Sequence, residues 1–69
     1  MNIDTEYINN LILSKGIKKQ AIASRLGITV QSLANKILGK TQFTYQEAML
    51  LFDILRVTSD EKKKIFPSK

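Results

Sequence analysis

The stretch that decides the fold spans residues 17–33 and reads IKKQAIASRLGITVQSL. Its apolar residues recur at helical spacing on both sides of Gly27, and Thr29 stands where it can cap a second helix. Ala23 lies four residues before that glycine, and Leu33 lies six after it. Two short helices that cross at a tight turn need a small residue where their backbones meet and an apolar anchor beneath the second helix. The stretch therefore predicts a helix-turn-helix motif.

The sequence on either side of this motif continues in helical periodicity, without an alternating strand pattern. The predicted helices span about residues 4–14, 18–26 and 30–38, then a fourth opened by Thr44 and a fifth from Thr58 to near Phe66. Glu47 and Glu61 each follow their threonine by three residues, which is the spacing of a capping box. We therefore expect an all-α fold in which residues 1–69 form one small domain.

Charge is distributed unevenly along the chain. No acidic residue occurs between Tyr7 and Gln46, whereas the same stretch holds Lys15, Lys18, Lys19, Arg25, Lys36 and Lys40. The formal net charge is +5. This surplus favours a polyanionic partner but does not identify it.

Several functional classes are disfavoured by what the chain lacks. It has no cysteine and no histidine, so the usual disulfide, metal ligand and general base are missing. None of its carboxylates pairs with a plausible nucleophile, and no glycine-rich phosphate loop is present. We therefore expect no enzyme activity, no cofactor and no metal. Apolar runs are short and no signal-peptide layout is visible, which favours a cytoplasmic protein without a membrane segment.

Residues 17–40 resemble the helix-turn-helix of the Cro and phage-repressor (XRE-type) family. The resemblance rests on Ala23, Gly27, Thr29, Leu33 and the Gly39-Lys40 pair, and the flanking helices also fit. It implies a compact five-helix, lambda-repressor-like domain that acts as a sequence-specific DNA-binding transcriptional regulator. The ending KILGK at residues 36–40 is similar to that of small regulators of phages and mobile elements of Gram-positive bacteria. A bacterial host follows, with association to the nucleoid when the protein is bound to DNA.

In this family the third helix enters the major groove, and its first residues read base edges. The resemblance carries that role to Val30, Gln31, Ser32 and Asn35. Glutamine and asparagine can each pair bidentately with adenine, and a valine methyl can pack on thymine. For Val30 a core role and a groove role both remain open. The third helix lacks arginine, so it holds no strong guanine reader.

Phosphate contacts are expected on both sides of the third helix. The family places a phosphate at the N-terminus of the second helix, which Lys18, Lys19 and Gln20 occupy here. Further candidates at the far end of the third helix are Lys36, Lys40 and Gln42. The alternative for these lysines is an ordinary solubilising role.

The expected partner is a double-stranded DNA operator, read by one copy or by a homodimer. The candidates for a dimer surface are the apolar residues Met49, Phe52, Ile65 and Phe66. An alternative function is a helix-turn-helix-shaped modulator that binds a phage repressor protein, and a toxin–antitoxin or plasmid-control partner is a third. The dependence of affinity on salt separates the DNA-binding regulator from the repressor-binding modulator, because only DNA binding releases several counterions.

Overall fold

The computed structural model describes residues 3–66 and contains five helices. They are α1 (Thr5–Lys15), α2 (Lys19–Leu26), α3 (Val30–Ile37), α4 (Tyr45–Leu55) and α5 (Ser59–Ile65). The described residues hold no strand, so the predicted all-α fold is confirmed. The observed ends lie within a residue or two of the predicted ones.

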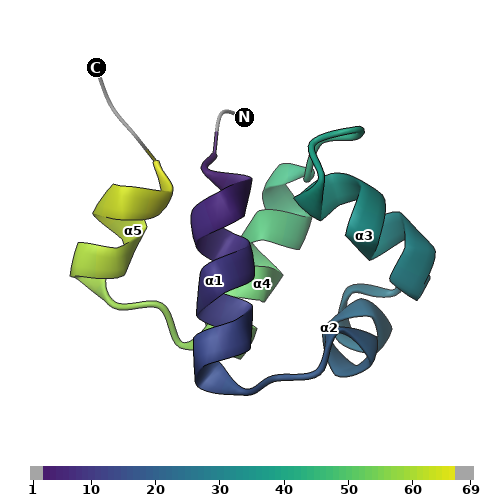
Figure 1. Cartoon of the computed structure of the whole chain (residues 1–69), viewed down its shortest axis with the longest axis horizontal. Helices are drawn as coiled ribbons and strands as arrows, with labels where there is room; N and C mark the ends of the chain where they lie inside the picture. Colours follow the sequence, from purple (N-terminus) through teal and green to yellow (C-terminus); the bar gives the residue numbers. More distant parts are fainter. Residues whose placement is uncertain (1–2, 67–69) are drawn as a thin grey trace.

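The helices are arranged around α1 and α4, which cross at the centre of the molecule (Figure 1). The α2–α3 pair packs on one side of this centre, where α2 touches α4 and α3 touches α1. On the other side α5 packs against α1 (Figure 1). This arrangement leaves the outer surfaces of α2 and α3 uncovered at one end of the molecule.

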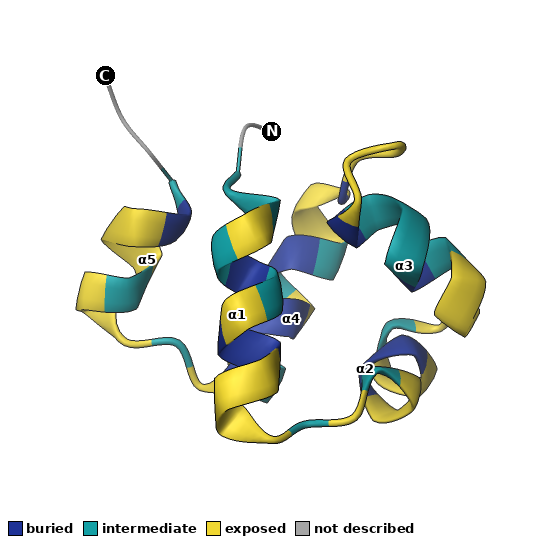
Figure 2. Cartoon of the chain, viewed as in Figure 1, coloured by how far each residue is buried: buried dark blue, intermediate teal, exposed yellow. Residues whose placement is uncertain are grey.

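One hydrophobic core lies where these helices meet. Its largest fully buried side chains are Ile8, Ile12, Ile22, Leu33, Leu51, Leu55 and Ile65, so every helix contributes. Figure 2 shows the buried surfaces turned toward α1 and α4, and exposed surfaces on the outside of α2, α3 and α5. No polar or charged residue among 3–66 is buried, so stability comes from apolar packing.

The turn between α2 and α3 has the predicted form. Gly27 adopts the left-handed conformation (φ 74°), its N–H donates to the Ser24 carbonyl, and the Ile28 N–H donates to the Ala23 carbonyl at 3.0 Å. These two bonds form a Schellman motif, which ends a helix and reverses the chain. Ala23 is 2% exposed and Leu33 is 0% exposed, as a close crossing above an apolar anchor requires.

Side chains cap the starts of α3, α4 and α5 where the sequence predicted them. The Ser32 N–H donates to Thr29 Oγ1 at 3.0 Å at the start of α3. Both capping boxes are present: Thr44 and Glu47 open α4, and Thr58 and Glu61 open α5. Each box satisfies two N–H groups that a helix start leaves without partners.

Contacts at both ends hold α5 against α1. The Asp4 N–H donates to the Ile65 carbonyl at 2.7 Å, and Lys15 Nζ lies 3.5 Å from Glu61 Oε1. The five helices within residues 3–66 include none with the length and apolarity needed to cross a bilayer.

Candidate nucleic-acid interface

The first two turns of α3 present a polar outer face. Gln31 is exposed and Ser32 and Asn35 are half-buried, whereas Leu33 and Ile37 on the opposite face are buried in the core. The core therefore fixes the rotation of α3 and determines which side chains point outward. Four predicted base-reading residues, Val30, Gln31, Ser32 and Asn35, lie together in these turns.

Gln31 and Asn35 are coupled on this face. Gln31 Nε2 donates to Asn35 Oδ1 at 3.3 Å, across one helical turn. The bond leaves Gln31 Oε1 free to accept and Asn35 Nδ2 free to donate. An amide that is already oriented loses less side-chain entropy when it pairs with a base.

Val30 is the residue for which two roles were open. Its side chain is 47% exposed, at the N-terminal end of α3. This exposure excludes the core role. Leu38, the C-cap residue of α3, is a second exposed apolar side chain on this helix, at 68%.

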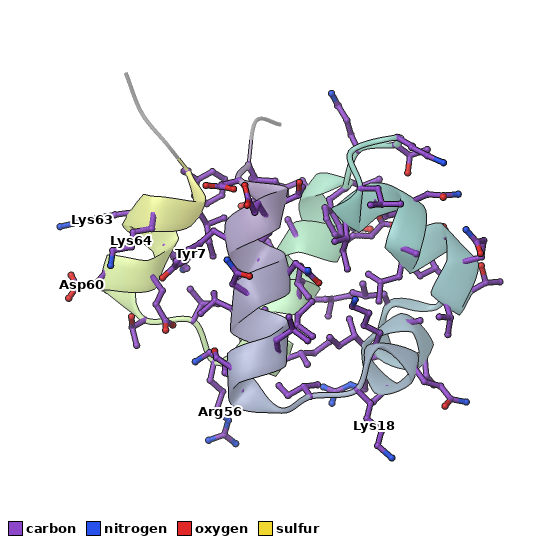
Figure 3. The ribbon with its side chains drawn as sticks, in the orientation of Figure 1. Tyr7, Lys18, Arg56, Asp60, Lys63 and Lys64 are labelled. Carbon is purple, nitrogen blue, oxygen red and sulfur yellow. The ribbon has the colours of Figure 1, made fainter. Side chains whose placement is uncertain are left out.

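The N-terminus of α2 differs from the starts of the other four helices. Lys18 is its N-cap residue, and no side chain caps this end, whereas Asp4, Thr29, Thr44 and Thr58 cap the others. Lys18 and Gln20 are exposed and Lys19 is half-buried. Figure 3 shows the Lys18 side chain projecting away from the molecule beside α2. Uncapped N–H groups and two ammonium groups together form an environment that suits an anion.

Lys36 does not have the position expected of a phosphate contact. Its Nζ lies 3.1 Å from Glu47 Oε1, donates to the Gln42 carbonyl at 3.0 Å and lies 5.9 Å from the centre of the Phe43 ring. Its side chain is only 11% exposed. In this structure the Lys36 ammonium instead joins α3 to the start of α4, which disfavours the predicted phosphate contact. Lys40 and the Gln42 side chain remain exposed in the α3–α4 loop.

The same contacts set the ionisation of Glu47. The hydrogen bond from the Thr44 backbone lowers the pKa of this carboxyl, and Lys36 lowers it further, while partial burial opposes both. In Glu61 the hydrogen bond from the Thr58 backbone lowers the pKa in the same way. Both capping boxes therefore favour the ionised carboxylate over the neutral acid.

Two of the four predicted dimer residues are buried within one copy. Phe52 is 4% exposed and Ile65 is 0% exposed, so placing them on an open surface was wrong. The Phe66 ring packs edge-on against Phe52 at 5.6 Å between centroids, which is why the apolar stripe of α4 is covered by its own chain. Met49 and Phe66 stay half-buried.

Other apolar residues are open on α4. Tyr45 is 67% exposed and Leu50 is 44% exposed. The sequence did not predict Tyr45 as part of a dimer surface, whereas Leu50 was among the apolar residues of this helix that were expected to be too many to point inward. Leu50 lies next to the apolar stripe that begins at Ala48, which is a sign that its side chain points to another face of the helix. Because α4 has many apolar residues, however, the sequence does not show which face is outward.

Comparison of the chain with protein-family models, with curated proteins and with solved structures found no match.

Proposed function

We propose that this chain is a sequence-specific DNA-binding regulator of the Cro and phage-repressor kind, with α3 in the major groove. The observation that supports it most is the coupled Gln31–Asn35 pair on the outer face of α3, beside the uncapped, lysine-bearing start of α2. The pair has the groups needed to read adenine, and the helix start has the groups needed to hold a phosphate.

The two parts would act together on a duplex. With α3 along the groove, Lys18 and Lys19 contact the backbone on one side and Lys40 contacts it on the other. Phosphate contacts set the position of the helix, and base contacts select the sequence. Bound at an operator, the protein would exclude polymerase or a competing repressor.

A short α3 reads few base pairs, so we propose that two copies bind one operator. Half-sites would then lie about 34–36 Å apart along one face of the duplex. The exposed Tyr45 and Leu50 on α4 are two of the apolar side chains available for contact between copies.

The test is selection of bound sites from random duplex DNA, followed by affinity measurements over a range of salt concentrations. We expect one enriched motif rich in A·T pairs and a log–log slope of about −3 per bound copy from three contacting lysines. An unenriched pool together with a slope near zero would contradict DNA binding.

A further inference from the structure

An open groove of about 560 Å³ lies between the C-terminal part of α4, the last turn of α2 and the start of α5. Met49, Ile54 and Val57 line it and are partly buried against the core. Two arginines and a lysine, Arg25, Arg56 and Lys62, also line it and are exposed. The groove thus combines a few partly buried apolar side chains with a cationic rim, and most of its accessible surface is polar.

The rim charges are available to a partner. Within residues 3–66 the ion pairs are Lys15–Glu61 and Lys36–Glu47, and neither involves a cation of this groove. Asp53 is the one carboxylate among the lining residues, against three cations. The groove therefore carries an excess of positive charge that the described part of the chain does not neutralise.

Arg56 has an unusual backbone conformation for its residue type. Its φ of 52° and ψ of 54° place it in the left-handed region, at the end of α4. Three other residues in 3–66 have positive φ, and all three are glycines: Gly16, Gly27 and Gly39. A side chain at this position crowds the backbone, so glycine would be the less strained choice. An arginine at a strained position is a reason to look for a function of its side chain.

The groove and the α3 surface are separate. None of the residues that line the groove belongs to α3. In Figure 3 the Arg56 side chain projects outward near the lower end of α1, away from α3 in this view. DNA bound along α3 would leave this groove accessible.

We propose that the groove docks an acidic segment of a partner protein. One apolar side chain of that segment would rest on Ile54 and Val57, and carboxylates on either side of it would pair with Arg25, Arg56 and Lys62. Arginine pairs well with carboxylates because its planar donors match both oxygens.

Two other occupants fit the chemistry less well. A nucleic acid strand gains much of its binding from stacking on exposed aromatic rings, and the one ring among the lining residues, Phe52, is 4% exposed. A second copy of this chain carries a net charge of +5, and its Asp60 and Glu61 are followed directly by three lysines. Charge repulsion would therefore oppose self-docking in this groove.

The test uses amide chemical-shift mapping on the full chain with three synthetic peptides of equal length. The first carries one leucine flanked by glutamates, the second has glutamine in place of glutamate, and the third has serine in place of leucine. We expect saturable shifts at Arg25, Asp53 and Val57 with the first peptide. The second and third should bind about tenfold more weakly, because they lack the charge pairs or the apolar contact.

Variants separate docking from folding. Arg56→Gly relieves the left-handed strain, so its melting temperature should be unchanged or higher, while its affinity for the first peptide falls about threefold. Arg25→Gln combined with Arg56→Gly should lower that affinity about tenfold. Lys63→Gln removes an exposed charge next to the groove lysine and should leave affinity within about twofold, since Lys63 does not line the groove.

Several results would overturn the proposal. The first is the absence of saturable shifts at the groove. The second is equal binding of all three peptides, or of a short single-stranded DNA at the same residues. The third is a dimer in sedimentation that Arg56→Gly dissociates, which would make a second copy the occupant. Gln31→Ala should leave peptide binding intact, so failure of the DNA-binding proposal and failure of this one are distinguishable.

Discussion

Gln31 and Asn35 carry the proposed sequence reading, and each can be removed without disturbing the core. We predict that Gln31→Ala and Asn35→Ala each reduce discrimination between the selected site and a mismatched site by about 1–3 kcal/mol. Non-specific affinity should change little, because phosphate contacts supply it. Gln46→Ala is the matched control, since Gln46 is also an exposed glutamine at the second position of its helix. Equal discrimination by the control and both α3 variants would contradict the placement of these two side chains in the major groove of DNA.

Mutation can distinguish the lysines proposed to contact phosphate, Lys18 and Lys19, from an ordinary surface lysine such as Lys63. We predict that Lys18→Ala and Lys19→Ala each reduce the salt slope by about one unit and weaken binding to all sequences alike. Lys63→Ala should leave the slope unchanged. A slope that stays the same in the Lys18 and Lys19 variants would show that they are ordinary surface lysines.

Lys36 should behave differently because its ammonium is used within the fold. We predict that Lys36→Met leaves the salt slope unchanged and lowers the free energy of unfolding by about 1 kcal/mol. The loss comes from the Glu47 ion pair and the bond to the Gln42 carbonyl. Denaturant unfolding and the salt titration measure the two effects on the same sample. A smaller salt slope with unchanged stability would return Lys36 to the DNA contacts.

At the scale of the elements, the crossing of α2 and α3 depends on a small side chain. Ala23 is 2% exposed at that crossing, and Ala23→Leu should cost about 1–3 kcal/mol through overpacking. Ala21→Leu is the control, since Ala21 is exposed on the same helix. Thermal unfolding followed by circular dichroism measures both. A melting temperature equal in parent and Ala23→Leu would refute the close packing of the two helices.

The capping box of α4 makes the fold sensitive to acid. The Thr44 backbone bond, with help from Lys36, holds the pKa of Glu47 below its ordinary value of 4.5. A carboxyl whose pKa is lower in the folded state contributes stability above 4.5, and that stability is lost as pH falls through the folded value. We predict that Glu47→Gln is less stable than the parent at pH 7 and that the difference shrinks below about pH 4. Urea unfolding over this pH range measures it. A constant difference would show that the charge of Glu47 is not involved.

The helices and their caps were predictable because the contacts that define them are local. Thr29 bonds to Ser32, and each capping box spans three residues, so sequence spacing alone indicates the contact. The ion pair of Lys36 with Glu47 joins two helices, so predicting it would have required knowledge of how those helices are placed relative to each other. Burial of Phe52 was missed for the same reason, because Phe66 from the far end of the chain covers it.

The left-handed Arg56 shows a different limit of sequence reasoning. At Gly16, Gly27 and Gly39 the residue type itself indicates a left-handed helix end. At Arg56 the residue type indicates the opposite. The groove that Arg56 lines was therefore not predictable from residue spacing. Gln31 and Asn35 lie four residues apart on a predicted helix, so their pairing was predictable from spacing, although the two amides were treated as independent.

At the scale of the whole molecule, the proposed binding of two copies to one operator can be tested by a substitution on α4. Phe66→Asp would be an unsuitable test, because Phe66 packs on Phe52 and its loss would disturb the core. Leu50→Asp changes a side chain that is 44% exposed and should leave folding intact. We predict that it weakens cooperative binding to a two-half-site operator while single half-site affinity is retained. Sedimentation on saturated DNA measures the number of copies. One copy per operator with the parent protein would eliminate the dimer.

The most direct measurement of the DNA-binding surface is the map of amide chemical-shift changes when a selected duplex is added to the isotope-labelled chain. We predict the largest changes in the first two turns of α3, including Gln31 and Asn35, and at Lys18 and Lys19 at the start of α2. Residues of α5 should change little, because α5 lies on the opposite side of the central helices (Figure 1). Largest changes in α4 and α5, with α3 unaffected, would contradict the placement of α3 in the major groove.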